Sequence, residues 1–201
     1  MVTGGSSGIG KELANILYAH DAKVYLAARS SEKATSTINE IKKAHLNSKG
    51  ELVFLKLDLD DLSTIKASAQ EFLDKETRLD VLWNNAGVMI PPQGSKTKQD
   101  YELQLGTNNV APFLFTKLLI PILEKTAKEA PAGSVRVVWV ASSAAERFSP
   151  EGGVDMSNLD CNKDQSAWHK YGVSKAGNIL QATEFAKRYK NTGIVSIVSV
   201  T

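Results

Sequence analysis

The sequence predicts an α/β fold: a doubly wound parallel sheet with helices on both faces, in three α/β/α layers. Short runs that are apolar along their whole length alternate with longer segments of helical periodicity. Such strands are buried on both faces, which favours a parallel sheet covered by helices. A glycine-rich segment also stands between the first apolar run and the first helix, where a strand–helix–strand unit makes its turn.

The expected strands are the apolar runs that are rich in β-branched residues, at 1–3, 23–28, 51–57, 81–84, 134–141 and 194–200. Helices are expected between them, at 8–20, 31–45, 61–77, 98–127 and 167–189. In the first helix, one buried face is predicted from the helical spacing of Ile9, Leu13, Ile16 and Leu17. Residues 147–165 are rich in Gly, Ser, Asp, Asn and Pro, so we expect a loop insertion there.

Composition limits the class of protein. A chain of 201 residues suits one domain, spanning 1–201, with a sizeable core. The net charge of +2, with Lys and Arg scattered, gives no reason to expect nucleic-acid binding. No apolar run approaches the roughly 18 residues of a membrane span, and the N-terminus lacks a signal-peptide pattern. A single cysteine, Cys161, excludes an internal disulfide and suits a reducing compartment, so we expect a cytoplasmic protein.

Glycines near the start of the chain have the spacing of a phosphate-binding turn. Gly4, Gly8 and Gly10 lead from a strand into a helix. Residues without a Cβ permit positive φ and a close approach of phosphate, and the helix N-terminus attracts the anion. A tight helix-entry turn would need the same glycines, but the strand at 23–28 completes the unit that a dinucleotide site requires. We therefore expect this loop to bind a dinucleotide, together with Ser6, Ser7 and Ile9.

The residue after the second strand bears on which dinucleotide is bound. An NAD site places Asp or Glu roughly 20 residues after the glycines, on the ribose 2′-hydroxyl. Here Arg29 follows the strand instead. A guanidinium pairs with a 2′-phosphate, which a carboxylate would repel, so NADP is expected and NAD is the less favoured cofactor. The alternative for Arg29 is a solvated charge at the start of a helix.

Two more strand ends offer contacts to the cofactor. Asp58 can accept a hydrogen bond from an adenine amino group, or it can serve as an N-cap or turn residue. Asn85, Ala86 and Gly87 are small enough for their loop to lie against the cofactor, although Asn-Asn-Ala-Gly could also form a simple turn.

Candidate catalytic residues lie in the second half of the chain. Tyr171 and Lys175 are four residues apart, on one face of a helix. A nearby ammonium stabilises a phenolate, which lets a tyrosine exchange a proton with an alkoxide. Ser142 ends an apolar strand, where its hydroxyl can polarise a carbonyl oxygen. Its neighbour Ser143 has the same spacing and stays open as an alternative, and both could be turn serines.

A metal site is not expected. No metal-ligand spacing relates the three histidines to one another or to the cysteine, at His20, His45, His169 and Cys161.

These motifs together resemble the short-chain dehydrogenase/reductase family. The family's Thr-Gly-x3-Gly-x-Gly is matched by Thr3 to Gly10, its Asn-Asn-Ala-Gly by Asn84 to Gly87, and its Tyr-x3-Lys by Tyr171 to Lys175. The motifs stand in the family's order over essentially the whole chain. The Ala-Arg after the second strand and the Leu57-Asp58-Leu59 run resemble the retinol-dehydrogenase-like branch, especially its fungal relatives.

The resemblance implies a Rossmann fold with strand order 3-2-1-4-5-6 and NADP-dependent interconversion of a small-molecule carbonyl and an alcohol. Ser142 would polarise the oxygen, Tyr171 would act as acid/base, and Lys175 would hold the nicotinamide ribose and stabilise the phenolate. Asn108 would support a water-linked proton relay, with Asn109 as the alternative if the register shifts by one. Leu59 joins Asp58, and Tyr171 joins Lys175, among the expected cofactor-binding residues. A homo-oligomer is possible for such an enzyme.

Compared with the family pattern, both ends are short. The first strand retains about three residues, against a usual five or six. The family continues past the last strand into a segment that covers the substrate. We therefore expect a shortened first strand and a missing substrate-lid region, and the alternative function is a nucleotide-binding fragment with impaired catalysis.

Overall fold

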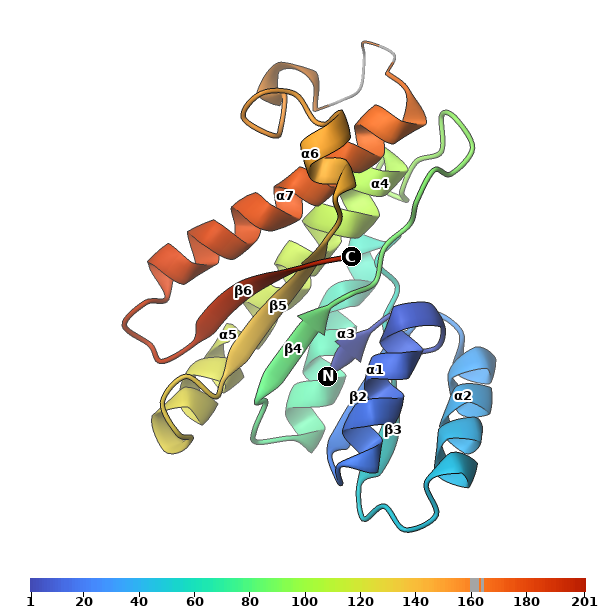
Figure 1. The fold of residues 1–201 in the computed structure, drawn as a ribbon, viewed down its shortest axis with the longest axis vertical. Helices are drawn as coiled ribbons and strands as arrows, with labels where there is room; N and C mark the ends of the chain where they lie inside the picture. Colours follow the sequence, from blue (N-terminus) through green and yellow to red (C-terminus); the bar gives the residue numbers. More distant parts are fainter. Residues whose placement is uncertain (160–162, 164) are drawn as a thin grey trace.

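The computed structural model describes residues 1–159, 163 and 165–201. Its sheet has six parallel strands in the order β3-β2-β1-β4-β5-β6, as predicted (Figure 1). The strands are β1 (Val2–Thr3), β2 (Lys23–Ala28), β3 (Glu51–Lys56), β4 (Val81–Asn84), β5 (Arg136–Ala141) and β6 (Val195–Val200). Cys161, the basis of the disulfide expectation, lies outside the described residues.

Helices cover both faces of this sheet. The larger ones are α1 (Gly8–Ala19), α2 (Ser31–Ala44), α3 (Leu62–Lys75), α5 (Ala111–Glu129) and α7 (Ala167–Arg188). The shorter ones are α4 (Leu103–Leu105), the π-helical turn η1 (Gly106–Val110), α6 (Ala144–Phe148) and the 3₁₀ turn η2 (Met156–Asn158). Over the described part of the chain, no helix has both the length and the apolar character needed to cross a membrane.

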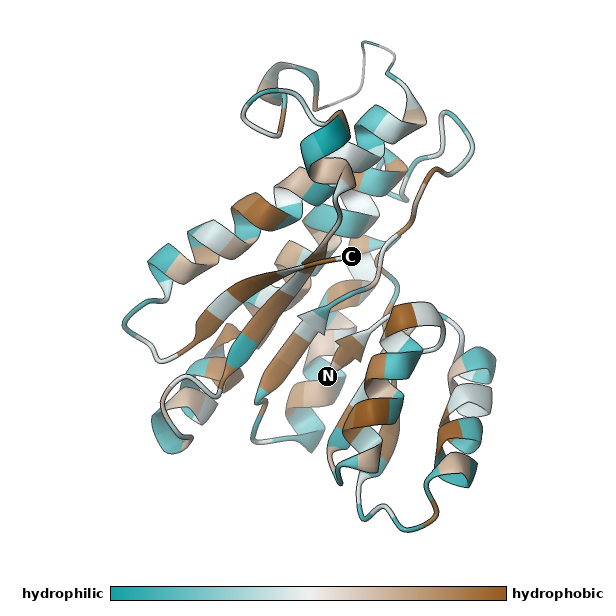
Figure 2. Cartoon of the chain, in the orientation of Figure 1, coloured by the Kyte–Doolittle hydropathy of each residue, from teal (hydrophilic) through white to brown (hydrophobic). Residues whose placement is uncertain are grey.

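The strand β2 shows why the molecule has three layers. Successive side chains of a strand point to opposite faces. Val24 and Leu26 pack with α1 and α2 on one face, whereas Tyr25 and Ala27 belong to the core beneath α3, α5 and α7. The strands are accordingly the most hydrophobic part of the chain in Figure 2, and the doubly wound fold is confirmed.

The predicted buried face of α1 is wrong in part. Ile9 and Ile16 are exposed, at 57% and 56% of their surface. The helix instead buries Gly10, Ala14 and Tyr18. The small residues Gly10 and Ala14 bring the helix backbone close to the sheet. A prediction based on large apolar residues alone does not identify this contact face.

The predicted helix at 98–127 begins later than expected. Residues 98–102 form a turn in which Asp100 has φ +64° and Thr97 N–H donates to Tyr101 O at 2.9 Å. Glu102 then caps α4 by accepting from Leu105 N–H at 2.8 Å. Within the expected loop at 147–165, the first two residues belong to α6, which extends to Phe148, and the short turn η2 occupies residues 156–158.

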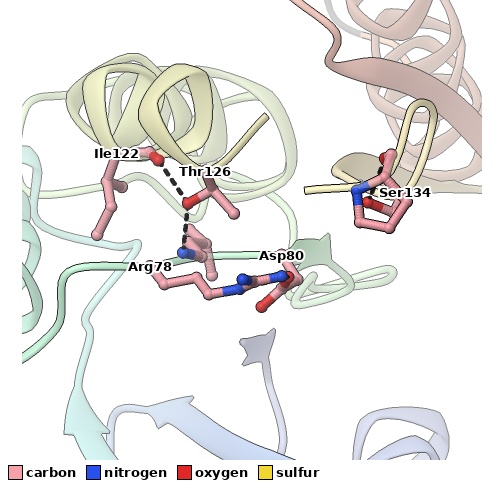
Figure 3. Close-up of polar contacts among 7 residues, drawn as sticks. Arg78, Asp80, Ile122, Thr126 and Ser134 are labelled. Atoms are coloured by element: carbon pink, nitrogen blue, oxygen red, sulfur yellow. Dashed lines mark hydrogen bonds and ion pairs between the residues drawn. The ribbon is translucent and has the colours of Figure 1, made fainter. Parts of the chain in front are cut away.

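At the edge of the sheet where the strands begin, hydrogen bonds and an ion pair hold the connecting segments in place (Figure 3). Buried Thr126 of α5 donates to Ile122 O at 2.7 Å and accepts from Leu79 N–H at 3.0 Å, which fixes α5 to the segment entering β4. Nearby, Arg78 pairs with Asp80 at 2.6 Å and Ser134 Oγ donates to Pro131 O at 2.6 Å. The candidate site residues gather at the other edge, where the strands end.

Candidate functional site

The glycine loop between β1 and α1 is folded as tightly as its sequence predicts. Gly4 and Gly8 have φ of +68° and +52°, a region that side chains rarely adopt. A Cβ on Gly10 would lie 2.5 Å from Gly4 O and 2.6 Å from Asn85 Nδ2. The start of α1 therefore lies against both the loop and the segment after β4, with its N-terminal N–H groups at the end of the sheet.

Thr3 holds two loops together. Its Oγ1 accepts from the backbone N–H groups of Asn85 and Ala86, each at 3.0 Å, while Asn85 Nδ2 donates to Thr3 O at 2.9 Å. These bonds keep residues 85–87 beside the glycine loop. The role of the Thr3 hydroxyl is not evident from sequence spacing, because its partners are more than 80 residues away.

A cavity of about 430 Å³ opens along this edge. Nine of the predicted cofactor-binding residues line it: Gly4, Ser6, Ser7, Ile9, Arg29, Leu59, Asn85, Ala86 and Gly87. The remaining lining residues are Ala27, Ala28, Ser30, Lys33, Leu57, Asp60, Val88 and Thr107. Gly8 and Gly10 shape the loop without lining the cavity.

Asp58 is placed as a turn residue. Its Oδ1 accepts from Asp60 N–H at 3.1 Å, and the lining of the cavity comes from its neighbours Leu57, Leu59 and Asp60. The carboxyl is half-buried at the end of β3. Asp58 therefore has the turn role, one of the two that the sequence allowed, and its side chain lies beside the cavity without lining it.

One end of the cavity carries two exposed cations. Arg29 follows β2, and Lys33 lies in the first turn of α2. Ser30 caps this helix by accepting from Lys33 N–H at 3.2 Å, so both cations stand beside a helix N-terminus. Sequence reasoning missed Lys33. The available signal was its place in the first turn of the helix that follows Arg29, because the start of this helix borders the cavity.

Tyr171 and Lys175 lie one turn apart on α7, next to the end of β5. Lys175 is 5% exposed, and its Nζ donates to Val140 O at 3.0 Å. The same Nζ lies 5.7 Å from the centre of the Tyr171 ring. Burial lowers the pKa of the Lys175 ammonium from 10.5 to about 8. A desolvated cation thus stands beside a half-buried phenol.

Asn108 connects the loop after β4 to α7. Its Oδ1 accepts from Val88 N–H at 2.8 Å, and its Nδ2 donates to Val88 O and to Ser174 Oγ, each at 2.9 Å. A Cβ on Gly87 would lie 2.9 Å from Asn108 Oδ1 and 3.5 Å from Lys175 Nζ. Asn109, the alternative, points toward α7 instead, where its Nδ2 donates to Asn178 Oδ1 at 2.8 Å.

The two serines after β5 differ in their surroundings. Ser142 is half-buried and its Oγ accepts from Ala144 N–H at 3.3 Å, which leaves the hydroxyl proton for another acceptor. Ser143 is exposed and begins α6. The segment after β5 packs against α7 at Gly172, where a Cβ would lie 2.8 Å from Ala144 O. Because Gly172 follows Tyr171, this contact brings the Ser142 segment alongside the tyrosine.

Within the described residues, no group of three His, Cys, Asp or Glu side chains is arranged to hold a metal ion.

Comparisons with known proteins agree with this architecture. The family model described as short chain dehydrogenase matches residues 1–201. A short-chain dehydrogenase/reductase of Phomopsis amygdali is 56% identical over 199 residues, covering 98% of this chain and 59% of the relative. The short-chain dehydrogenase/reductase pkfC of Emericella nidulans is also 56% identical over 199 residues, covering 98% of this chain and 64% of the relative.

A solved structure with the same fold is the NADP active-site complex of Pseudomonas aeruginosa RhlG. It has a TM-score of 0.74 and 28% identity, and the match covers 98% of this chain and 68% of that one. The chain spans about three fifths of the length of the two curated relatives. Neither relative's name specifies a branch, so the retinol-dehydrogenase-like branch stays a prediction. On the family model and the two relatives, the chain belongs to the short-chain dehydrogenase/reductase family.

Proposed function

We propose that this protein interconverts a small-molecule carbonyl and an alcohol by NADP-dependent hydride transfer, with Tyr171 moving the proton. One observation carries the proposal: the buried Lys175 ammonium lies 5.7 Å from the Tyr171 ring. Lys175 lies at the end of β5, where its Nζ is close to Gly87 in the cavity wall. A phenol beside a desolvated cation is suited to acid/base chemistry, and the adjacent cavity is suited to a dinucleotide.

The residues present fit NADP. Gly4 and Gly87 line the cavity and have no space for a Cβ, so backbone forms the wall where a pyrophosphate and ribose would lie. Arg29 and Lys33 supply positive charge at the position where a 2′-phosphate is recognised. The solved P. aeruginosa relative with this fold is an NADP complex, which supports the same cofactor here.

Each part of the cofactor has residues in this chain that would hold it. The α1 N-terminus and the loop with Ser6 and Ser7 would bind the pyrophosphate. Arg29 and Lys33 would bind the 2′-phosphate, and Leu59 with the Asp58 turn would border the adenine. Ala86, Gly87 and Lys175 would hold the nicotinamide ribose. When bound, NADPH supplies a hydride to the carbonyl carbon, and NADP⁺ accepts one from the alcohol.

The protein's own part is to hold and move a proton at the substrate oxygen. Ser142 donates a hydrogen bond to that oxygen and stabilises its developing negative charge. Tyr171 gives its phenolic proton to the alkoxide in reduction and takes the proton back in oxidation. Lys175, charged beside the ring, stabilises the phenolate in both directions. Asn108 holds the Gly87–Val88 loop against α7 and supports a water-linked proton relay.

Cofactor preference tests this function directly. We expect the protein to oxidise NADPH with members of an aldehyde and ketone panel, and to prefer NADPH to NADH. Arg29→Asp should lower the NADPH/NADH ratio of kcat/KM by about tenfold or more, because a charged hydrogen bond contributes about 1.5–3 kcal/mol. Lys33→Gln should lower it in the same direction by less.

A matched control is Lys43→Gln, which removes a charge from the other end of α2. It should leave the ratio unchanged. Turnover with neither cofactor, at any carbonyl in the panel, would contradict the proposed function. An unchanged ratio in Arg29→Asp would remove Arg29 from the 2′-phosphate site.

A further inference from the structure

Two buried asparagine side chains are hydrogen-bonded to each other close to Lys175. The sequence predicted neither this pair nor a positioning role for it. Asn109 of η1 and Asn178 of α7 are 5% and 3% exposed. Asn109 Nδ2 donates to Asn178 Oδ1 at 2.8 Å, and Asn178 Nδ2 donates to Val140 O at 2.9 Å. We call this pair the amide clamp. Its far end is the same carbonyl that accepts from Lys175 Nζ.

The chemistry of the two end groups fixes the orientation of both amides. Val140 O can only accept, so the NH₂ group of Asn178 must face it and its Oδ1 must face Asn109. Asn109 Nδ2 also donates to the backbone oxygen of Ser174, which again can only accept. Each amide therefore has one permitted orientation, and the clamp joins η1, α7 and β5 in a single arrangement.

The helix opposite is shaped to admit the clamp. A Cβ on Gly177 would lie 1.8 Å from Asn109 Oδ1, so only glycine at this position lets the Asn109 amide lie against α7. In η1, two consecutive residues both reach Ser174: Asn108 bonds its Oγ and Asn109 bonds its carbonyl oxygen. Ser174 immediately precedes Lys175, so the contacts of η1 fix the backbone that carries the lysine.

We propose that Asn109 and Asn178 are positioning residues that hold Lys175 and the end of β5 in catalytic register without touching cofactor or substrate. Val140 O receives two donors, and Asn178 supplies the one that persists while Lys175 turns its ammonium toward a ribose. The carbonyl is then never left unpaired in the buried site, and β5 stays in place just before Ser142. This inference rests on the proposed function of Lys175.

A double-mutant cycle tests whether Asn178 acts through Lys175. Asn178→Leu keeps the side-chain shape and removes both hydrogen bonds. We expect it to lower kcat/KM with NADPH by about ten- to hundredfold, as displacement of a catalytic group by an ångström does. In a Lys175→Met background the same change should have almost no further effect. Asn178→Ala provides a smaller replacement if the leucine variant does not fold.

The matched control is Gln181→Leu. Gln181 Nε2 donates to the backbone oxygen of Asn109 at 3.3 Å, so the control removes a bond between the same two elements one turn away from the clamp. It should lower the thermal midpoint without changing kcat. The proposal is overturned if Asn178→Leu leaves kcat/KM unchanged, or if it costs the same factor with and without Lys175.

A second readout separates failure of the clamp from failure of the proposed function. The free energy of unfolding in urea is measured for the cofactor-free wild type, Asn178→Leu, Lys175→Met and the double variant. The effects of the two substitutions should not add, because both side chains bond Val140 O. Absence of all NADPH turnover would contradict the proposed function, while coupling in unfolding would still support the clamp. Strict additivity in unfolding would overturn the clamp whatever the activity.

Discussion

At the scale of single residues, the site depends on a buried lysine that is held by one carbonyl. The ammonium of Lys175 is removed from water, and burial lowers its pKa to about 8. Its bond to Val140 O compensates only part of that loss of hydration. We therefore expect Lys175 to destabilise the cofactor-free protein, a loss that its proposed role beside Tyr171 would explain.

Lys175→Met should therefore stabilise the cofactor-free protein at pH 7 while strongly lowering turnover to a small residual rate. At about 1.4 kcal/mol per pKa unit, burial disfavours the charged form of Lys175 by roughly 3 kcal/mol in the folded wild type. The variant avoids this penalty but lacks the hydrogen bond to Val140 O, which offsets about 1 kcal/mol of the gain. The variant leaves Val140 O bonded to Asn178. Urea unfolding of both proteins measures the difference.

The pH dependence of this difference has a definite sign. Below pH 8, Lys175 is protonated in the folded and the unfolded protein, so the whole penalty is present. Between about 8 and 10.5 the folded protein loses its proton first, so the unfolded state binds more protons and the wild type gains stability as pH rises. The advantage of Lys175→Met should shrink across this window. An advantage that stays constant would show that burial of the charge is not its cause.

At the scale of elements, the contact between η1 and α7 organises the site. The π-helical turn presents Asn108 to the loop after β4 and Asn109 to α7. Such turns are frequent at functional sites because an altered hydrogen-bond ladder re-aims side chains. Gly177, in the interior of a long helix, is the complementary feature, since glycine is otherwise unfavourable there.

Gly177→Ala should destabilise the fold by about 1–3 kcal/mol, the usual effect of overpacking, because its Cβ would overlap Asn109 Oδ1. The loss should disappear in an Asn109→Ala background, where alanine at 177 should instead gain up to about 1 kcal/mol of helix propensity. Thermal unfolding of the four proteins provides the measurement. Equal destabilisation in both backgrounds would rule out a clash with Asn109.

At the scale of the whole molecule, the strand order gathers residues from distant parts of the chain. Parallel strands all end at one edge, so the glycine loop after β1, Arg29 after β2, Gly87 after β4 and Ser142 after β5 meet there. The opposite edge is closed around Thr126 (Figure 3). This separation leaves one edge for structural contacts and the other for chemistry.

Most element bounds were predictable, because apolar strands, helical periodicity and glycine spacing are local patterns. The strand order was predicted only from the resemblance to the short-chain dehydrogenase/reductase family, and the sheet has that order. Asn178 and the hydroxyl of Thr3 were not, since their partners lie tens of residues away and depend on side-chain geometry. Exposed Ile9 and Ile16 show the same limit: the sequence marks large apolar residues, whereas the packed ridge of α1 uses Gly10 and Ala14. Lys33 required knowing that the start of α2 borders the cavity.

Transfer of deuterium most directly tests the central claim that Tyr171 moves the proton while NADPH gives the hydride. The protein is incubated with NADPH that carries deuterium at both C4 positions of the nicotinamide and with a carbonyl that it reduces, and the alcohol is analysed by mass spectrometry. We predict one deuterium on the carbinol carbon with the wild type, and almost no product with Tyr171→Phe, which lacks the phenolic proton. Deuterated alcohol formed equally fast by Tyr171→Phe, or alcohol without deuterium from the wild type, would contradict the account.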